Sequence, residues 1–419
     1  MTFLLKLYNT LTRKLDVFKS KEEGKVKLVT CGPSIYQLPH IGNYRTFMFE
    51  DILQRYLEYL GYDVQRLINI TDVEDKTLVE AGKQNISPKE LTQKNIEIFL
   101  NELKQLKIKI PAFIERSSTS VNEAVEIIEI LLEQGYAYWY TYKGRKNVYF
   151  DPLNFDDFGK LYGLDMSKWP KKRRRYHRDN YSGDRWNKGD FILWRGYKKG
   201  DTQFWDTNLG KGYPAWNIQD QAMVKKTFGF DVDIWCSGID STHRHHDYII
   251  ATVESILEKP FVNYWLHCSH LIFDGEKMSK RKGNIKYPSD LIKTKCIWNH
   301  IRFFLIYGHY RRKLNFTYTE YSKSCDLLIS FREMVETLRI PETSKRVSSD
   351  KAKKLVTKIK TDFENHMNND LHVKSAFNSL YDTVSKLVDM NEQHLLSAKD
   401  SKTALDELKA IDSVFQVIF

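Results

Sequence analysis

The feature that most limits the fold is a strand, a helix and a second strand that follow one another within residues 26–70. The segment VKLVTCG at 26–32 is typical of a short buried strand that ends at a glycine–proline turn. Apolar residues then recur at helical spacing over 45–60, and DVQRLINI at 63–70 predicts the next strand. Such a βαβ unit requires a parallel sheet with a ligand crevice at the carboxyl ends of its strands.

The remaining chain changes character several times. Residues 87–135 favour helices, whereas 136–213, rich in aromatic residues and glycine, indicate an inserted, irregular surface element. A strand at 234–238 and a following helix resume the sheet pattern, and helices dominate after Leu291. We therefore predict an α/β fold, with a Rossmann-like parallel-sheet catalytic domain split by an insertion and followed by an all-α helical bundle domain.

Composition excludes several classes of protein. Hydrophobic residues make up 42% and charged residues 28% of the 419 residues, which excludes a disordered or collagen-like chain. No stretch reaches the roughly 18 apolar residues of a membrane span, and the N-terminus lacks the apolar core of a signal peptide. Five scattered cysteines predict no disulfide framework, so we expect a cytoplasmic enzyme without a membrane partner. The net charge of +11 favours a polyanionic partner.

Two short motifs carry phosphate chemistry. In PHIGN, at 39–43, His40 and Asn43 can donate to phosphate oxygens, Gly42 lets an adenine ring approach, and a following helix N-terminus favours anions. KMSKR, at 277–281, supplies flexible ammonium groups suited to a developing pyrophosphate. Taken singly, the first motif is equally compatible with an ordinary loop and the second with a solvated basic loop.

Together and in this order, the two motifs resemble the HIGH and KMSKS signatures of class I aminoacyl-tRNA synthetases, and further segments resemble cysteinyl-tRNA synthetases. The resemblance extends from end to end of the chain. Its segments are LYNTLTRK at 7–14, TCGPSIYQLPHIGN at 30–43, NITDVEDK at 69–76, DFILW at 190–194, AWNIQDQAM at 215–223, SGIDSTHRHHD at 237–247, EKMSKRKGN at 276–284 and RFFLIYGHYRRKLNFT at 302–317.

The resemblance implies a ligase that activates L-cysteine with ATP, releases pyrophosphate, and transfers cysteine to the 3′ end of tRNA(Cys). Catalysis would rest on His40, Asn43, Lys277 and Lys280, with Mg²⁺ accompanying the nucleotide. The implied ATP-binding residues are His40, Gly42, Asn43, Asp240, Lys277, Ser279 and Lys280. Without the family, the alternative interpretation of Asp240 is a turn or helix-cap residue before the following helix.

The implied cysteine pocket comprises Cys31, Gly32, Thr71, Trp216 and His245. From the residues alone, Trp216 is more typical of a core and Thr71 of a turn cap.

Zinc is an open question in this sequence. Members of the family hold the substrate thiolate with a zinc ion bound by two cysteines, a histidine and a glutamate. Cys31 and His245 occupy two of these positions, but Asp220 stands where the family has cysteine and Ile249 where it has glutamate. Zinc could bind through Cys31, Asp220, His245 and water, or the site could hold no metal. It could also bind through nearby substitutes, namely His243, His246, Asp247 and Cys236. We favour the metal-free interpretation because two ligand positions changed together.

The resemblance also implies a division of the chain. The expected units are 1–135, first half of the catalytic domain; 136–213, connective insertion; 214–265, second half; 266–305, KMSKS-loop and stem-contact region; and 306–419, a bundle of the anticodon-binding type. The partners would be tRNA(Cys), L-cysteine and ATP, and the chain would be a monomer. Two alternatives are a cysteine ligase that acts on an amino sugar, as in the mycothiol pathway, and a degenerate synthetase that binds tRNA.

The basic run KKRRRYHR generates a test of the tRNA hypothesis. Neutralising Lys171, Arg173, Arg174 and Arg175 together should flatten the salt dependence of tRNA affinity, because each lost phosphate contact lowers the slope by about 0.9. Dissociation constants measured over a salt series against the unmodified chain provide the check. An unchanged slope would mean that the run is a solvated surface loop.

Overall fold

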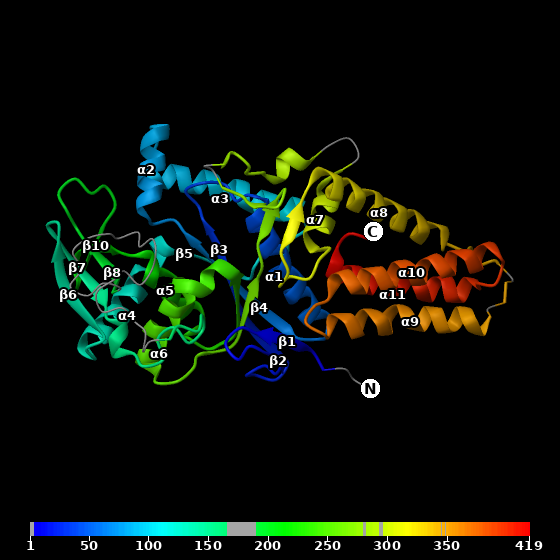
Figure 1. The fold of residues 1–419 in the computed structure, drawn as a ribbon, viewed down its shortest axis with the longest axis horizontal. Helices are drawn as coiled ribbons and strands as arrows, with labels where there is room; N and C mark the ends of the chain where they lie inside the picture. The colour runs from blue at the N-terminus through cyan, green and yellow to red at the C-terminus, as the bar shows by residue number, and fades with distance from the viewer. Residues whose placement is uncertain (1–3, 166–189, 280–281, 293–295, 345, 348) are drawn as a thin grey trace.

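A five-stranded parallel sheet lies in the middle of the molecule (Figure 1). The computed structural model describes residues 4–165, 190–279, 282–292, 296–344, 346–347 and 349–419. The sheet has the order β12–β11–β3–β4–β5, with every pair parallel. Its strands are β3 (Lys25–Ser34), β4 (Asp63–Thr71), β5 (Phe113–Arg116), β11 (Val232–Gly238) and β12 (Val262–Cys268). Helix α1 (Ile41–Tyr59) connects β3 to β4, so the predicted βαβ unit is confirmed.

Helices cover both faces of this sheet because its strands are apolar on both sides. Leu28 packs into the cluster that contains α1, whereas the next residue, Val29, packs into the cluster that contains Val224 and Ile250 on the opposite face. The covering helices are α1 and α3 (Pro88–Gln105) on the first face, and α5 (Trp216–Phe228) and α6 (Asp247–Leu257) on the second. The remaining helices of this half are α2 (Asp75–Gln84) and α4 (Val121–Glu133).

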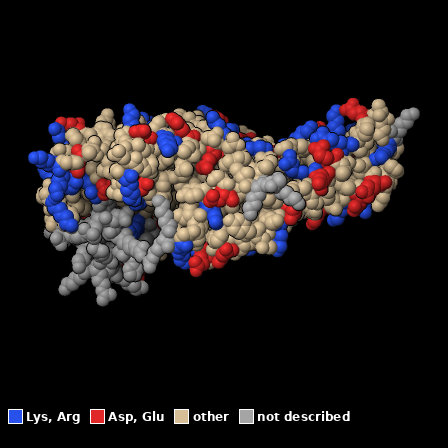
Figure 2. Space-filling model, turned by 90° about the horizontal axis from the view of Figure 1, so that it is seen from above, with Lys and Arg blue, Asp and Glu red and all other residues tan. Residues whose placement is uncertain are grey.

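The insertion contains an antiparallel sheet of order β6–β7–β8–β10–β9, so the expectation of an irregular element is wrong for its described part. The strands are β6 (Ala137–Tyr142), β7 (Arg145–Phe150), β8 (Phe191–Gly196), β9 (Trp205–Thr207) and β10 (Gly210–Pro214). Aromatic residues favour strands through cross-strand packing, as between Tyr138 and Tyr149, whose ring centroids lie 6.2 Å apart. Lysine and arginine side chains gather at this end of the molecule (Figure 2). The run 171–178 lies outside the described residues.

The C-terminal part is helical, as predicted. Its helices are α7 (Trp298–Ile306), α8 (Tyr318–Thr337), α9 (Asp350–Met367), α10 (Val373–Glu392) and α11 (Ala398–Phe415). A small sheet of β13 (Leu271–Phe273), β14 (Glu276–Lys277) and β15 (Leu314–Phe316) joins it to the catalytic half, and β1 (Lys6–Asn9) pairs with β2 (Lys14–Val17). The exact unit boundaries stay predictions. Within the described ranges, no helix has both the length and the apolarity needed to cross a membrane.

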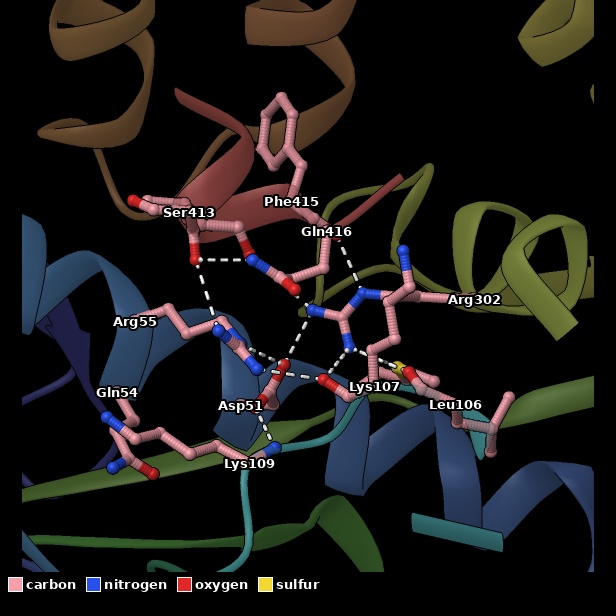
Figure 3. Close-up of polar contacts among 12 residues, drawn as sticks. Asp51, Gln54, Arg55, Leu106, Lys107, Lys109, Arg302, Ser413, Phe415 and Gln416 are labelled. Atoms are coloured by element: carbon pink, nitrogen blue, oxygen red, sulfur yellow. Dashed lines mark hydrogen bonds and ion pairs between the residues drawn. The ribbon is translucent and has the colours of Figure 1, made fainter. Parts of the chain in front are cut away.

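A buried ion pair joins α1 to the helical part (Figure 3). One terminal nitrogen of Arg302, on α7, lies 2.6 Å from Asp51 Oδ2, and both side chains are fully buried. Arg55 Nε contacts the same oxygen at 2.9 Å, while the backbone N–H of Lys109 donates to Oδ1 at 2.7 Å. Burial raises the pKa of the Asp51 carboxyl, but the neighbouring guanidiniums outweigh it and hold the pKa below its ordinary value.

The guanidinium of Arg302 also donates to backbone carbonyls from two distant segments. Its Nε donates to the Phe415 carbonyl at 2.7 Å, at the end of α11, and another nitrogen donates to the Leu106 carbonyl at 3.0 Å, just after α3. Because nearly all polar atoms of the pair have partners, the desolvated charges are compensated. The two residues thus hold α1, the α3–β5 connection and the C-terminus against one another.

Breaking this pair should destabilise the whole chain. Asp51→Ala leaves the Arg302 charge buried without its carboxylate, so the free energy of unfolding should fall by about 3–5 kcal/mol in urea titrations. Arg339→Ala, which removes an exposed pair with Glu336, is the control and should leave the free energy of unfolding nearly unchanged. Equal, small losses in both variants would contradict the assigned role of the buried pair.

Candidate active site

A cavity of about 420 Å³ opens at the carboxyl ends of β3 and β11, beside the N-terminus of α1. This is the edge at which the βαβ unit predicts a ligand crevice. The cavity brings together most of the residues selected from the sequence: Cys31, Gly32, His40, Gly42, Asn43, Trp216, Asp240, His245 and Lys277. Thr71, Asp220 and Ser279 are not among its lining residues.

His40 caps the helix that points at the cavity. Its Nδ1 accepts from the Gly42 backbone N–H at 3.0 Å, and the Asn43 side chain accepts from the His40 backbone N–H at 3.0 Å. Burial lowers the pKa of His40 below its ordinary value, despite the opposing effect of Asp240. The ring is therefore neutral at pH 7, and since Nδ1 accepts, its proton is on Nε2. The ring can thus donate one hydrogen bond while the helix dipole favours an anion.

The loop after β14 faces this helix terminus across the cavity. Lys277 and Met278 both line the cavity, and a Cβ at Gly42 would lie 2.7 Å from His40 Cε1 and 3.0 Å from Met278 Cε. Only glycine leaves both neighbours in place. The backbone N–H of Ser279 donates to the Asn284 side chain at 2.8 Å, which fixes the start of the loop. Lys280 lies outside the described residues.

Asp240 lies in the turn that follows β11, on the cavity wall. A Cβ at Gly238 would lie 2.9 Å from Asp240 Oδ1, so this glycine leaves room for the carboxylate. The side chain is exposed and can accept two hydrogen bonds from a ligand.

Cys31 and Trp216 form a different part of the cavity wall. Cys31 lies near the end of β3, Trp216 is the first residue of α5, and the Trp216 ring centroid lies 5.3 Å from that of His245. Trp216 Nε1 is buried and has no hydrogen-bond partner within the described ranges. It is therefore available to a bound molecule.

Gly32 and Thr71 have clear roles in the sheet. A Cβ at Gly32 would lie only 1.9 Å from the Asn69 carbonyl oxygen, so strand packing alone requires glycine there. Thr71 ends β4, and its carbonyl accepts from the Ile35 N–H at 3.0 Å. The structure thus places Thr71 at the expected strand end, beyond the residues that line the cavity.

Asp220 contacts His245 directly. Asp220 Oδ2 lies 2.7 Å from His245 Nε2, and the Asp220 side chain is nearly fully buried. The other ring nitrogen of His245, Nδ1, is buried without a partner among the described residues. A carboxylate on one nitrogen fixes the ring and leaves the other nitrogen available.

His246, the next residue, lies against Cys31. Its Nε2 is 3.5 Å from Cys31 Sγ, and its Nδ1 is 2.8 Å from His267 Nε2. Trp235 Nε1 donates to the same sulfur at 3.3 Å. Burial lowers the pKa of His246 well below its ordinary value, whereas burial and then the Asp220 charge raise the pKa of the Cys31 thiol well above its own. Without a metal, Cys31 is therefore a protonated thiol.

The family's four zinc ligands do not fit this chain. Ile249 is fully buried in the apolar cluster that contains Val29 and Trp235, and a hydrocarbon cannot ligate a metal. The described residues do include one group of possible ligands, Cys31, His245 and His246, with one ligand atom of each within 4.8 Å of the others. Asp220 is not part of that group.

Sequence reasoning missed Trp235 and His267 as neighbours of the site. Trp235 lies on β11 and His267 on β12, the strand at the edge of the parallel sheet, and both lie in runs that read as core. A polar histidine within the apolar run VNYWLHC was the only available signal, because a buried polar side chain needs a partner.

Comparisons with known proteins show the family to which the chain is similar. Residues 17–326 match the family described as tRNA synthetases class I (C) catalytic domain. The chain is 36% identical to a cysteine–tRNA ligase of Chlamydia pneumoniae, covering 99% of this chain and 86% of that protein. It is also 36% identical to a cysteine–tRNA ligase of Brachyspira hyodysenteriae, covering 90% and 79%.

Solved structures show the same fold at low identity. A Mycobacterium tuberculosis methionyl-tRNA synthetase in complex with methionyl-adenylate superposes with a TM-score of 0.66 at 12% identity, covering 93% of this chain and 89% of that chain. A LeuRS of Agrobacterium radiobacter K84, in a ternary complex with tRNA and LeuAMS, gives 0.69 at 10% identity, covering 96% and 85%. With the matched catalytic domain and the full-length relatives, the chain belongs to the cysteinyl-tRNA synthetases, the class I cysteine–tRNA ligases.

Proposed function

We propose that this chain forms cysteinyl-adenylate from L-cysteine and ATP and then transfers cysteine to the 3′ end of tRNA(Cys). In the first step a carboxylate oxygen of cysteine attacks the α-phosphorus of ATP, and the bond to the bridging oxygen breaks to release pyrophosphate. In the second step a terminal ribose hydroxyl of the tRNA attacks the cysteinyl carbonyl carbon, and AMP leaves. The observation that carries the proposal is the convergence of His40, Asp240 and Lys277 on one cavity.

The start of α1 would bind the triphosphate. His40 Nε2–H donates to a phosphate oxygen, because Nδ1 is held by the Gly42 N–H. The oxygen of the Asn43 amide completes the helix cap, and its nitrogen would donate to a phosphate oxygen. These donors are positioned before ATP binds, so charge that develops on the phosphates meets groups that need little reorganisation.

Lys277 and Asp240 would complete ATP binding from the other side of the cavity. The Lys277 ammonium, followed by Lys280 in the sequence, neutralises the departing pyrophosphate together with Mg²⁺ carried by the nucleotide. The Asp240 carboxylate accepts from the ribose hydroxyls. This placement leaves the side of the cavity near Cys31 and Trp216 for the amino acid.

Transfer requires the acceptor end of tRNA at the same cavity. The insertion carries exposed lysines that support a surface for contacts with the phosphate backbone of tRNA: Lys143, Lys146, Lys198, Lys199 and Lys211. Residues 306–419 would read the anticodon, and we propose that the chain acts as a monomer.

A charging assay tests the function as a whole. Purified chain with ATP, Mg²⁺ and labelled L-cysteine should attach label to tRNA(Cys) and not to an aminated sugar. The control is tRNA with its terminal adenosine removed, which should accept no label. Label on the sugar would identify the chain as an amino-sugar ligase, and labelled adenylate without transfer to either acceptor would contradict the second step.

Lys277→Ala tests the role of the loop. Removing one preorganised cationic donor should slow cysteine-dependent ATP–pyrophosphate exchange by about 10²- to 10³-fold. Cysteine affinity measured without ATP should not change. Lys282→Ala is the matched control, because Lys282 Nζ is already paired with Glu276 at 2.8 Å. Equal exchange rates for wild type and Lys277→Ala would refute the role; Lys280→Ala is expected to behave as Lys277→Ala does.

A further inference from the structure

A second cavity, of about 370 Å³, is lined by residues of α1, of the segment 307–314 and of the start of α10. No described residue lines both this cavity and the candidate active site. Its volume lies in the range of about 300–1,000 Å³ that is typical of pockets for small molecules. The second cavity is therefore large enough to hold a ligand of its own.

Positive charge dominates the lining of the second cavity. No aspartate or glutamate is among its described lining residues, and Asp370, nearby, accepts from Tyr310 and Arg311 at 2.6 Å each. The lining includes four cationic side chains: Arg45, Arg312, Lys313 and Lys374. None of the four forms an ion pair within the described ranges. Their charge is thus available to attract an anion.

Arg45 is the buried member of this group. Its guanidinium is fully buried and donates to two backbone carbonyls, those of Leu305 and, at 3.0 Å, of His309. Its Nε has no partner in the described part of the chain. Because a guanidinium has five N–H donors and two are used, three remain without a protein acceptor there.

The other buried arginines close to α1 have carboxylates beside them, whereas Arg45 has none. Arg302 pairs with Asp51 at 2.6 Å, and the Asp51 charge opposes the effect of burial on the pKa of Arg66. Burial lowers the pKa of Arg45, and the neighbour that opposes this is only the Cys268 thiol. Burial raises the pKa of that thiol to about 11, so it is neutral at pH 7. A desolvated charge without a counter-charge is costly, and an external anion would compensate it.

The first turn of α10 adds backbone donors to the same cavity. The first N–H groups of a helix have no partner within it, and the N-cap residue His372 makes no side-chain cap hydrogen bond. Lys374 and Ser375, in this turn, both line the cavity. Asn378, one turn later, accepts from the Tyr307 hydroxyl at 2.7 Å, which leaves its amide nitrogen as a donor. A helix start of this kind favours a phosphate group.

We propose that the second cavity binds a small phosphorylated molecule. Its phosphate accepts hydrogen bonds from the Arg312, Lys313 and Lys374 side chains and from the start of α10, and its charge compensates Arg45. A phosphate carries close to two negative charges and several acceptor oxygens, so it matches this set of cations better than a carboxylate does. The site lies outside the cavity assigned to ATP, so it does not depend on the proposed function.

Calorimetric titration with inorganic phosphate at constant ionic strength tests the site. The double variant Lys313→Gln, Lys374→Gln should bind phosphate about 10-fold or more weakly than wild type, because charged donors are lost. Lys323→Gln with Lys353→Gln is the matched control: it removes the same charge from exposed, already paired lysines of the helical part. This control should bind phosphate as wild type does. Phosphate should also raise the midpoint of thermal unfolding of wild type.

The candidate active site can also attract phosphate, and Lys277→Ala separates the two sites. This variant should retain the binding event that Lys313→Gln, Lys374→Gln loses. Equal affinity of wild type and that double variant would overturn the proposal, as would the absence of phosphate binding to wild type. Arg45→Gln should weaken phosphate binding as well; if Arg45→Gln fails to fold, the lysine variant decides.

The phosphate backbone of tRNA is the other source of the same chemistry. If the ligand is a small molecule, the salt dependence of tRNA(Cys) affinity should have the same slope in Lys313→Gln, Lys374→Gln as in the Lys323→Gln, Lys353→Gln control. A slope that falls by about 0.9 for each lost contact in the cavity variant alone would assign the cavity to tRNA and overturn the small-molecule proposal. Chain that binds phosphate here but charges no tRNA would refute the ligase activity and leave this site intact.

Discussion

The buried carboxylate of Asp51 is the constraint on which the rest of this structure depends. It lies in the middle of α1, between the helix terminus that faces the cavity and the end that packs on the C-terminal helices. Asp51 forms an ion pair with the fully buried guanidinium of Arg302 and so compensates its desolvation. The same guanidinium donates hydrogen bonds to the backbone carbonyls of Leu106 and Phe415. One hydrophobic cluster therefore runs from the parallel sheet into the helical part, and α1 is held firmly behind the active site.

The same helix explains why the His40 and Asn43 side chains need no induced assembly. His40 and Asn43 bond to each other's backbone as part of a helix cap, so the fold fixes their positions. The opposite wall, by contrast, is a loop whose start is held by Asn284, which accepts from the Ser279 backbone N–H and donates to the Lys277 carbonyl. A rigid wall facing a loop suits a reaction in which a charged product must leave after each cycle.

Much of this could be predicted from the sequence because its signals are local. The βαβ unit at 26–70 and the C-terminal helices follow from hydrophobic spacing, and the motifs at 39–43 and 277–281 contribute His40 and Lys277 to the lining of one cavity. The insertion sheet escaped prediction because aromatic residues separated by glycines carry no clear period. The contact between the Asp220 and His245 side chains could not be predicted for a different reason. It joins residues from separate helices, and no spacing along the chain reveals which atom of a carboxylate faces which nitrogen.

The histidine that caps α1 links acid sensitivity of the fold to that of the site. Because burial depresses the His40 pKa, the unfolded chain takes up a proton at this residue before the folded chain does as the pH falls below 6.5. The stabilisation that neutral His40 provides is therefore present above that pH. It is lost as the pH falls through the pKa of His40 in the folded chain. Protonation at Nδ1 also removes the acceptor for the Gly42 N–H. Protonation of His40 in acid therefore removes the cap of the first turn of α1. The same ring would bind the nucleotide.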